Sequence, residues 1–233
     1  MGMFDSFKAR KALIDHRKGN IAAARAAYEA LYADGFINAS YMISWSYILL
    51  REGGEENYKK VKEILVKAQK DPTLTEQQRG DLLVNFAVAD YKLGNTEKAV
   101  ELLERVHQKT PKGETYGALG YVLIEQGDAE KAMAFNEAAL EYDDEDPVIL
   151  DNLGQIHYRL LNNKEKALEY FNRAHELKPG QIDTLWFLSR YDLEAGKKDD
   201  AIEKLTTALE GRFSPLNYVT KATVEEEISR LRG

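Results

Sequence analysis

One sequence pattern recurs six times along the chain and constrains its fold more than any other feature. Each copy has a polar turn containing Gly, Asn or Asp, then a small residue within a stretch rich in Ala, Leu, Glu and Lys. The small residues lie 37, 38, 33, 35 and 34 positions apart, at Ala24, Val61, Ala99, Ala132, Ala167 and Ala201. A nearly fixed period in this range is typical of a solenoid of stacked helical units.

The fourth copy shows how one unit is expected to fold. We predict a first helix over residues 114–125 and a second over residues 129–142. The turn Gly127-Asp128 separates them, because Gly ends a helix in a left-handed conformation and Asp caps the next one. Gly120 and Ala132 are small, so the two helix backbones can approach closely. A single pair cannot bury its own apolar face, and neighbouring units must therefore stack.

These residues resemble the tetratricopeptide repeat. In the fourth copy the resemblance lies in Leu119-Gly120, Gly127-Asp128, Ala132 and Ala139, and in the fifth in Leu153-Gly154, Ala167, Phe171, Ala174 and Pro179. The fifth copy departs from the pattern by one inserted residue near Asn162-Asn163. The resemblance implies an all-α fold: a right-handed superhelical solenoid of antiparallel helix pairs, with about six repeats and a C-terminal capping helix.

The predicted solenoid is a single domain over residues 1–233. Its units are approximately residues 5–39, 40–78, 79–113, 114–147, 148–180 and 181–213, with a capping segment over residues 214–233. In that segment Thr223 and Glu226 have the spacing of a capping box. An apolar stripe of Val224, Ile228 and Leu231 is expected to cover the last unit. Phe4 and Phe7 are expected to cover the first unit in the same way.

The composition excludes several classes of function. The chain has no cysteine, which removes disulfides and thiolate chemistry and fits a reducing, cytoplasmic compartment. No apolar run approaches the roughly 18 residues that a membrane span needs, so no membrane insertion is expected. Gly2 and Ser6 match a short myristoylation pattern, although an added leader sequence explains the start of the chain as well.

The net charge of −7 is distributed unevenly. Residues 1–30 carry six basic and three acidic side chains, a sum of +3, whereas residues 114–155 carry one basic and eleven acidic, a sum of −10. Binding to phosphates needs a broad basic surface. Nucleic acid is therefore not expected as a partner.

No pattern of catalytic or metal-binding residues is present in the sequence. The histidines His16, His107, His157 and His175 never lie three or four positions apart, so no helix presents a metal-binding pair. The acidic run Asp143–Asp146 fits a solvated loop and lacks the ligand spacing of a calcium loop. We therefore predict that the chain is not an enzyme and that it uses no metal or cofactor.

The resemblance implies that the first helix of each unit lines a concave groove. The inner positions then become Tyr41, Trp45, Arg51, Asn85, Tyr91, Lys92, Tyr121, Asp151, Asn152, Gln155, Tyr158, Arg159, Trp186, Phe187 and Arg190. The predicted peptide-binding site comprises Asn85, Tyr91, Tyr121, Asn152, Gln155, Tyr158, Arg159, Trp186 and Arg190. Aromatic residues and Arg are enriched at binding hot spots. For any single ring, packing between helices is the alternative.

Asn85 and Asn152 are similar to the asparagine with which family members hold the backbone of a ligand. The Lys and Arg that clamp a C-terminal carboxylate in chaperone-binding relatives are missing. The corresponding positions are Gly117, Tyr121, Asp183 and Phe187 around Asn152, and Ser44, Ile48, Glu114 and Ala118 around Asn85. A chaperone C-terminal peptide is therefore disfavoured, and the remaining Arg residues favour some acidic character in the ligand.

The sequence thus predicts a scaffold that binds a peptide or a partner-protein segment in its groove. The alternative is a weakly self-associating assembly subunit, in which the basic N-terminal end of one copy meets the acidic middle of another. Such a contact is head-to-tail and gives rings or fibres instead of a closed dimer.

Overall fold

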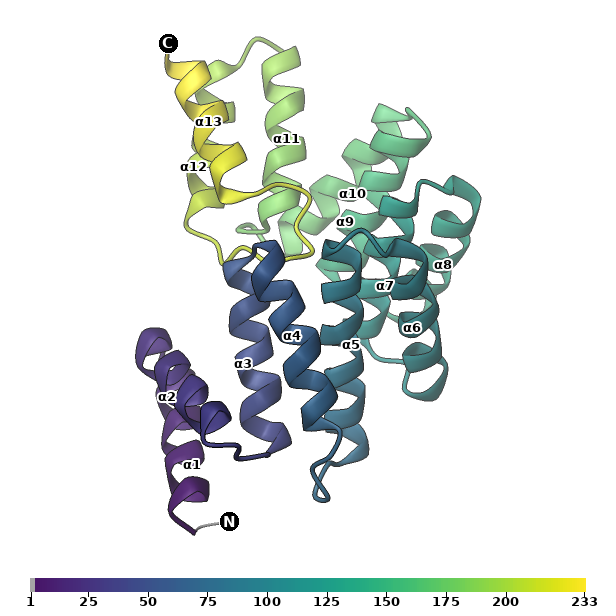
Figure 1. The fold of residues 1–233 in the computed structure, drawn as a ribbon. Coiled ribbons are helices and arrows are strands. Elements are labelled where there is room, and N and C mark those ends of the chain that lie inside the picture. Colours follow the sequence, from purple (N-terminus) through teal and green to yellow (C-terminus); the bar gives the residue numbers. More distant parts are fainter. Residues whose placement is uncertain (1–2) are drawn as a thin grey trace. The chain divides into compact units, whose positions relative to one another are not determined.

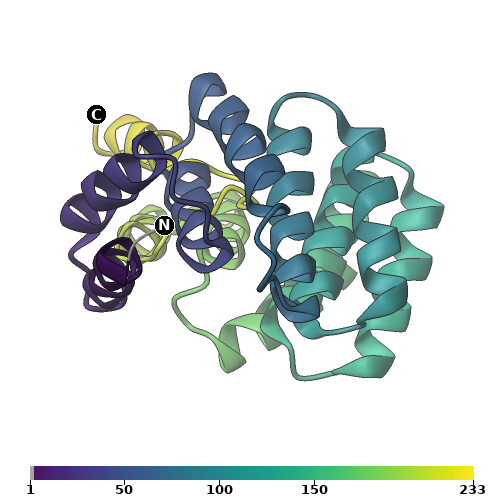
Figure 2. The ribbon, with the colours of Figure 1, turned by 60° about the horizontal axis from the view of Figure 1, so that its bottom comes forward.

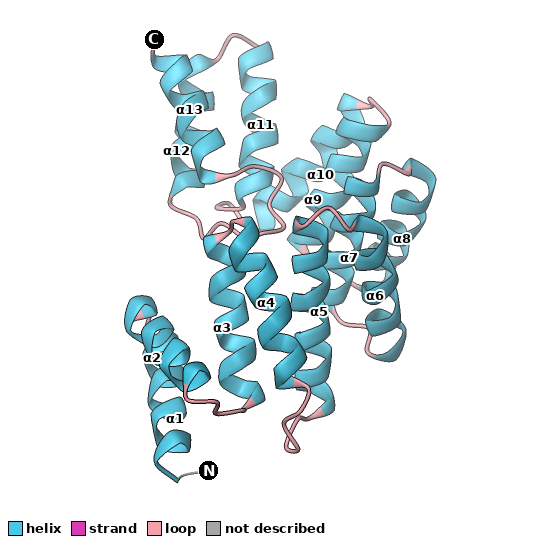
Figure 3. Ribbon diagram, viewed as in Figure 1, coloured by secondary structure: helices cyan, strands magenta, loops and turns pink. Residues whose placement is uncertain are grey.

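The computed structural model describes residues 3–233, so Gly2 lies outside the described residues. Every regular element in that range is helical: thirteen α-helices and one short π-helical segment (Figure 3). None of these helices is both long and apolar enough to cross a membrane. The all-α prediction is confirmed. The chain divides into two compact units, the first ending at Val106 and the second starting at His107.

The first unit is built from consecutive helix pairs. Its helices are α1 (Met3–Arg17), α2 (Ile21–Ala33), α3 (Ala39–Glu52), α4 (Glu55–Ala68), α5 (Glu76–Lys92) and most of α6 (Thr96–Lys109). Helix α1 packs on α2, α3 packs on α4, and α5 contacts both α3 and α4 (Figure 1). The interior is aromatic as well as aliphatic, since Tyr28, Tyr41 and Trp45 are buried.

The second unit continues the same pattern. Its helices are α7 (Gly113–Gln126), α8 (Ala129–Tyr142), α9 (Pro147–Gln155), the π-helical segment η1 (Ile156–Leu160), α10 (Lys164–Leu177), α11 (Ile182–Glu194), α12 (Lys198–Leu209) and α13 (Lys221–Arg232). Helix α8 has the predicted bounds. Gly127 is left-handed with φ 85°, and the Asp128 side chain accepts from the Lys131 amide at 3.0 Å. Helices α7 and α8 lie side by side in both views (Figure 1 and Figure 2).

Glycine allows the paired helices to approach closely. A Cβ atom added at Gly154 would lie 2.5 Å from the ring of Phe171, and one at Gly120 would lie 2.4 Å from Asn136 Oδ1. The small residue Ala132 is fully buried, as predicted. The nearest neighbour of Gly120 is Asn136, one turn beyond Ala132, because the longer amide side chain reaches across to it.

The C-terminal helix α13 covers the last pair. Its apolar stripe packs into a buried cluster that includes Leu205 and Val219. The predicted capping box is one turn out of place: the helix starts at Lys221, and the Thr220 hydroxyl accepts from the Thr223 amide at 3.1 Å. Thr220 is the cap because its own backbone is extended, with ψ 161°.

The expected cover at the other end is absent. The side chains of Phe4 and Phe7 are 69% and 66% exposed. Helix α1 instead buries Ala9 and Ala12 on its opposite side. The prediction that the two phenylalanines pack onto the first pair was wrong.

Substitution of Gly154 should destabilise the second unit. The new methyl group of Gly154→Ala would overlap the Phe171 ring, which is fully buried and cannot move away. We expect a loss of about 1–3 kcal/mol in the free energy of unfolding, measured by urea denaturation. Gly180→Ala is the matched control, because nothing lies within 4 Å of a Cβ atom there. Equal unfolding midpoints for the two variants would contradict the proposed close contact.

Candidate functional site

The nine predicted site residues fall into both units. Asn85 and Tyr91 lie on α5 in the first unit, and both are half-buried. The Asn85 side chain donates from Nδ2 to Ser46 Oγ at 3.0 Å. Lys92 Nζ lies 5.4 Å from the centre of the Tyr91 ring. The other seven residues lie in the second unit, which therefore carries most of the candidate site.

Three of those seven residues are internal. Tyr121, Asn152 and Gln155 are 4%, 2% and 0% exposed. Asn152 donates from Nδ2 to the Gly117 carbonyl at 3.3 Å and so ties α9 to α7. In this structure the amide holds a neighbouring helix of its own chain. Tyr158, Arg159, Trp186 and Arg190 are the members that reach the surface.

A chain of hydrogen bonds connects three helices beneath this surface. Thr184 donates to Asp151 Oδ1 at 2.5 Å, and Gln155 Nε2 donates to Asp151 Oδ2 at 2.7 Å. The Gln155 carbonyl oxygen then accepts from Arg159 Nη1 at 2.9 Å. Arg159 Nη2 forms an ion pair with Glu125 Oε1 on α7 at 2.6 Å. Arg159 is therefore held in place by two protein partners.

A second buried carboxylate organises the segment between α12 and α13. Asp183 accepts from Asn217 Nδ2 at 2.9 Å and from the amides of Tyr218 and Val219 at 3.0 and 3.3 Å. Burial raises the pKa of Asp151 to about 6. Burial and the nearby charge of Asp151 raise the pKa of Asp183 to about 7. Two acidic groups thus lie close together in the interior, each fixing polar neighbours.

The inserted residue of the fifth copy is absorbed as a π-turn. Within η1 the helix widens, and the Leu161 amide donates to the Ile156 carbonyl at 3.0 Å, five residues back. Asn162 follows with φ 50°, the one non-glycine residue with positive φ among those described. Tyr158 and Arg159 lie inside this widened turn. Such π-turns often occur at functional sites.

The π-turn brings Arg159 against an aromatic residue that the sequence did not indicate. The Arg159 guanidinium carbon lies 4.2 Å from the centre of the Tyr218 ring, and Tyr218 stacks on Phe187 at 5.1 Å. Tyr158 also contacts Phe187, at 5.1 Å. Tyr218 is 41% exposed. We call Tyr158, Arg159 and Tyr218 the Arg159–Tyr218 surface. Tyr218 lies outside the repeat frame, so periodicity does not indicate it; its position just before the capping helix is the available sequence signal.

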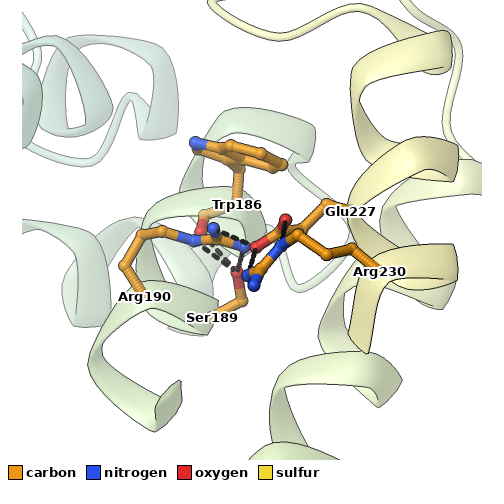
Figure 4. A network of polar contacts seen from close by, with 5 residues as sticks. All are labelled: Trp186, Ser189, Arg190, Glu227 and Arg230. Carbon is orange, nitrogen blue, oxygen red and sulfur yellow. Dashed lines mark hydrogen bonds and ion pairs between the residues drawn. The ribbon is translucent and has the colours of Figure 1, made fainter. Parts of the chain in front are cut away.

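Trp186 and Arg190 form a separate polar cluster with α13 (Figure 4). The guanidinium of Arg190 lies 4.2 Å from the centre of the Trp186 ring and forms an ion pair with Glu227 at 2.5 Å. Arg230 also bonds Glu227, at 2.7 Å. Hydrogen bonds from Arg230 and Arg190 lower the pKa of Glu227 to about 2. The capping helix thus supplies the carboxylate partner of Arg190.

Metal ligands do not converge in residues 3–233, where no group of three His, Asp or Glu side chains has a metal-binding arrangement. The buried carboxylates Asp151 and Asp183 already have hydrogen-bond donors from their own chain.

Comparison with known proteins identifies the repeats. Two family models of the tetratricopeptide repeat match the sequence, over residues 84–148 and 149–181. No curated protein matches the chain. One similar solved structure is that of PilF from Pseudomonas aeruginosa, with a TM-score of 0.60 and 16% identity over 97% of each chain.

Two further structures show the same fold. TTC0263, a TPR protein of Thermus thermophilus, has a TM-score of 0.54 and 16% identity over 98% of each chain. YrrB has a TM-score of 0.53 and 23% identity, over 76% of this chain and 88% of its own. At these identities the likeness shows the fold alone.

The buried carboxylates should make stability depend on pH. Their raised pKa values mean that the native state binds protons more tightly than the unfolded chain, in which Asp has its ordinary value of 3.8. Their stabilising contribution is therefore lost as pH rises through about 6 and 7. We expect Asp151→Asn to reduce this loss, because it removes one of the two buried charges.

The measurement is the free energy of unfolding in urea at about pH 5 and about pH 8 for the wild type and the variant. The difference between the two proteins isolates the contribution of the buried pair, because every other titratable group is the same in both. Asp199→Asn, on an exposed side chain of α12, is the control. Parallel pH profiles for wild type and Asp151→Asn would contradict the prediction.

Proposed function

We propose that this chain, which belongs to the tetratricopeptide-repeat family, is a scaffold that binds an extended segment of a partner protein. The observation that carries the proposal is the Arg159–Tyr218 surface, where the guanidinium of Arg159 in η1 lies against an exposed ring in the segment between α12 and α13. YrrB, described as a TPR protein with an unusual peptide-binding site, supports the proposal by its similar fold.

The surface offers both polar and apolar contacts to such a segment. A guanidinium has five N–H donors, and Arg159 uses Nη1 and Nη2 toward Gln155 and Glu125. Its remaining N–H groups are free to donate to main-chain carbonyls of the ligand. The rings of Tyr158 and Tyr218 would take apolar or aromatic side chains, and the stiff frame keeps the loss of conformational entropy on binding small.

The proposed ligand differs from the sequence prediction in charge. Arg159 and Arg190 each have an intramolecular carboxylate, Glu125 and Glu227. A ligand carboxylate would have to compete with these partners. We therefore propose a segment recognised by its backbone and its apolar side chains, in place of an acidic one.

The other predicted residues have secondary parts in this proposal. Asn85 and Tyr91 stay proposed contacts of the first unit, and Tyr121, Asn152 and Gln155 support the surface from within. Trp186 and Arg190 would bind a ligand only where α13 leaves them accessible. We also propose that the chain has no catalytic activity. Its cytoplasmic location and its lack of nucleic-acid binding stay predictions.

The proposal is tested with peptides selected from a displayed random-peptide library on the intact chain. We expect Tyr218→Ala and Arg159→Met each to weaken binding of the selected peptides by about 1–2 kcal/mol, or roughly tenfold, because each removes a contact at the centre of the surface. Fluorescence polarisation with labelled peptides measures the affinities.

Tyr47→Ala is the control, since Tyr47 is a comparably exposed ring, 48% accessible, on α3. Thermal unfolding of each variant verifies that the fold is kept. Selected peptides that bind Tyr218→Ala and Arg159→Met as tightly as the wild type would refute the assigned surface, and a library that yields no binder would refute peptide binding itself.

A further inference from the structure

Helix α1 presents an exposed apolar face. Phe4 and Phe7 are the most exposed large hydrophobic side chains described, and Ile14, at 42%, is also exposed. At 3.6 residues per turn these three fall on one side of the helix, opposite Ala9 and Ala12, which pack against the unit. An exposed apolar face of this kind marks an interaction surface.

Basic side chains flank this apolar face. Arg10, Lys11 and Arg17 are all exposed and lie beside the phenylalanines on the helical projection, and the exposed Lys18 follows the helix directly. Over residues 3–18 the chain carries five Lys or Arg and two Asp, so the sum is +3. We call Phe4, Phe7, Arg10, Lys11 and Ile14 the basic face of α1. Its occupant should offer apolar contact surrounded by negative charge.

The second unit carries a surface with that composition. Tyr142 at the end of α8 is 53% exposed, and Val148 at the start of α9 is 39% exposed. Glu141 precedes Tyr142 in the sequence, and Asp143, Asp144 and Glu145 lie between Tyr142 and Val148; all four carboxylates are exposed. We call these six residues the acidic edge.

The acidic edge is supported by packed rings, and its carboxylates have few positively charged partners within the chain. The Tyr142 ring lies 4.7 Å from that of Tyr116, so it stands on a packed aromatic base. The cation Arg173 donates to the main-chain carbonyl of Asp144 at 3.2 Å, and the carboxylates of Glu141 and Asp144 form no ion pair within residues 3–233. Positively charged side chains of another molecule could therefore pair with these carboxylates with little competition from cations of the same chain.

We propose that the basic face of α1 in one copy docks on the acidic edge of a second copy. Phe4 and Phe7 would cover Tyr142 and Val148, while the basic side chains face the carboxylates. Two basic faces, or two acidic edges, would repel each other, so the contact joins different surfaces. Where the contact is made in one direction only, it leaves one free surface of each kind on the dimer and propagates into chains or rings. It uses neither Arg159 nor Tyr218 and is independent of the proposed function.

Sedimentation velocity of the full-length protein tests the proposal. At high micromolar concentration and low salt, the wild type should form species larger than the 26.4 kDa monomer, and added salt should dissociate them. Phe4→Ser with Phe7→Ser disables the basic face, and Glu141→Lys with Asp144→Lys disables the acidic edge. Each double variant alone should associate at least about tenfold more weakly than the wild type.

Mixing the two double variants is the decisive experiment. Each keeps the surface that the other has lost, so an equimolar mixture should form a 1:1 dimer and nothing larger. Glu203→Lys with Glu210→Lys makes the same change in net charge at exposed sites elsewhere, and should assemble like the wild type.

Several results would overturn the proposal. These are a wild type that stays monomeric at every concentration, double variants that associate like the wild type, and a mixture that stays monomeric. A monomeric wild type that binds vesicles of anionic lipid through Phe4 and Phe7 would also overturn it, because the basic face would then be a lipid surface.

Discussion

The close approach of paired helices at a glycine is the contact on which the second unit depends. At Gly154 the backbone of α9 lies so near the Phe171 ring of α10 that even a methyl group would overlap it. Phe171 in turn stacks on Phe187 of α11 at 4.9 Å, and Phe187 supports both Tyr158 and Tyr218. Because Gly154 has no side chain, α9 and α10 pack closely. This packing sets the spacing of three helices and the position of the rings that they support at the surface.

The inserted residue of the fifth copy lies in the same part of the structure and bears on how α9 and α10 pack. A regular helix keeps its side chains in a fixed rotation, and one extra residue would carry every later side chain to a different face. The π-turn over Ile156–Leu160 absorbs the extra residue locally, so that α10 keeps its packing on α9. Arg159 lies inside the turn and is held between Glu125 and Tyr218. The departure from the repeat therefore coincides with the surface proposed to bind ligand.

Sequence periodicity predicted the helices well, but it did not predict how the candidate side chains are buried and paired. The all-α class, the helix pairs and the bounds of α8 are confirmed, because short-range patterns of Gly, Asp and apolar residues determine them. The burial of Asn152 and Gln155 and the pairing of Arg190 with Glu227 depend on residues 33–37 positions apart. The repeat pattern predicts which face of a helix is buried. It does not predict which side chain from a distant part of the sequence contacts that face. Tyr218 lies outside any repeat, so no periodicity could indicate it.

Two kinds of surface on this chain differ in whether their charged side chains are paired within the chain. Around the candidate site the charged groups are paired internally: Arg159 with Glu125 and Arg190 with Glu227, each with both side chains at most 20% exposed. Partly buried pairs of this kind are weakly screened by salt, and they leave a nearly neutral, ring-rich surface. On α1 and along the acidic edge the charges are exposed and of one sign, so their interactions fall steeply with ionic strength. Peptide binding should therefore persist at a salt concentration that disperses an assembly, because different electrostatics govern the two contacts.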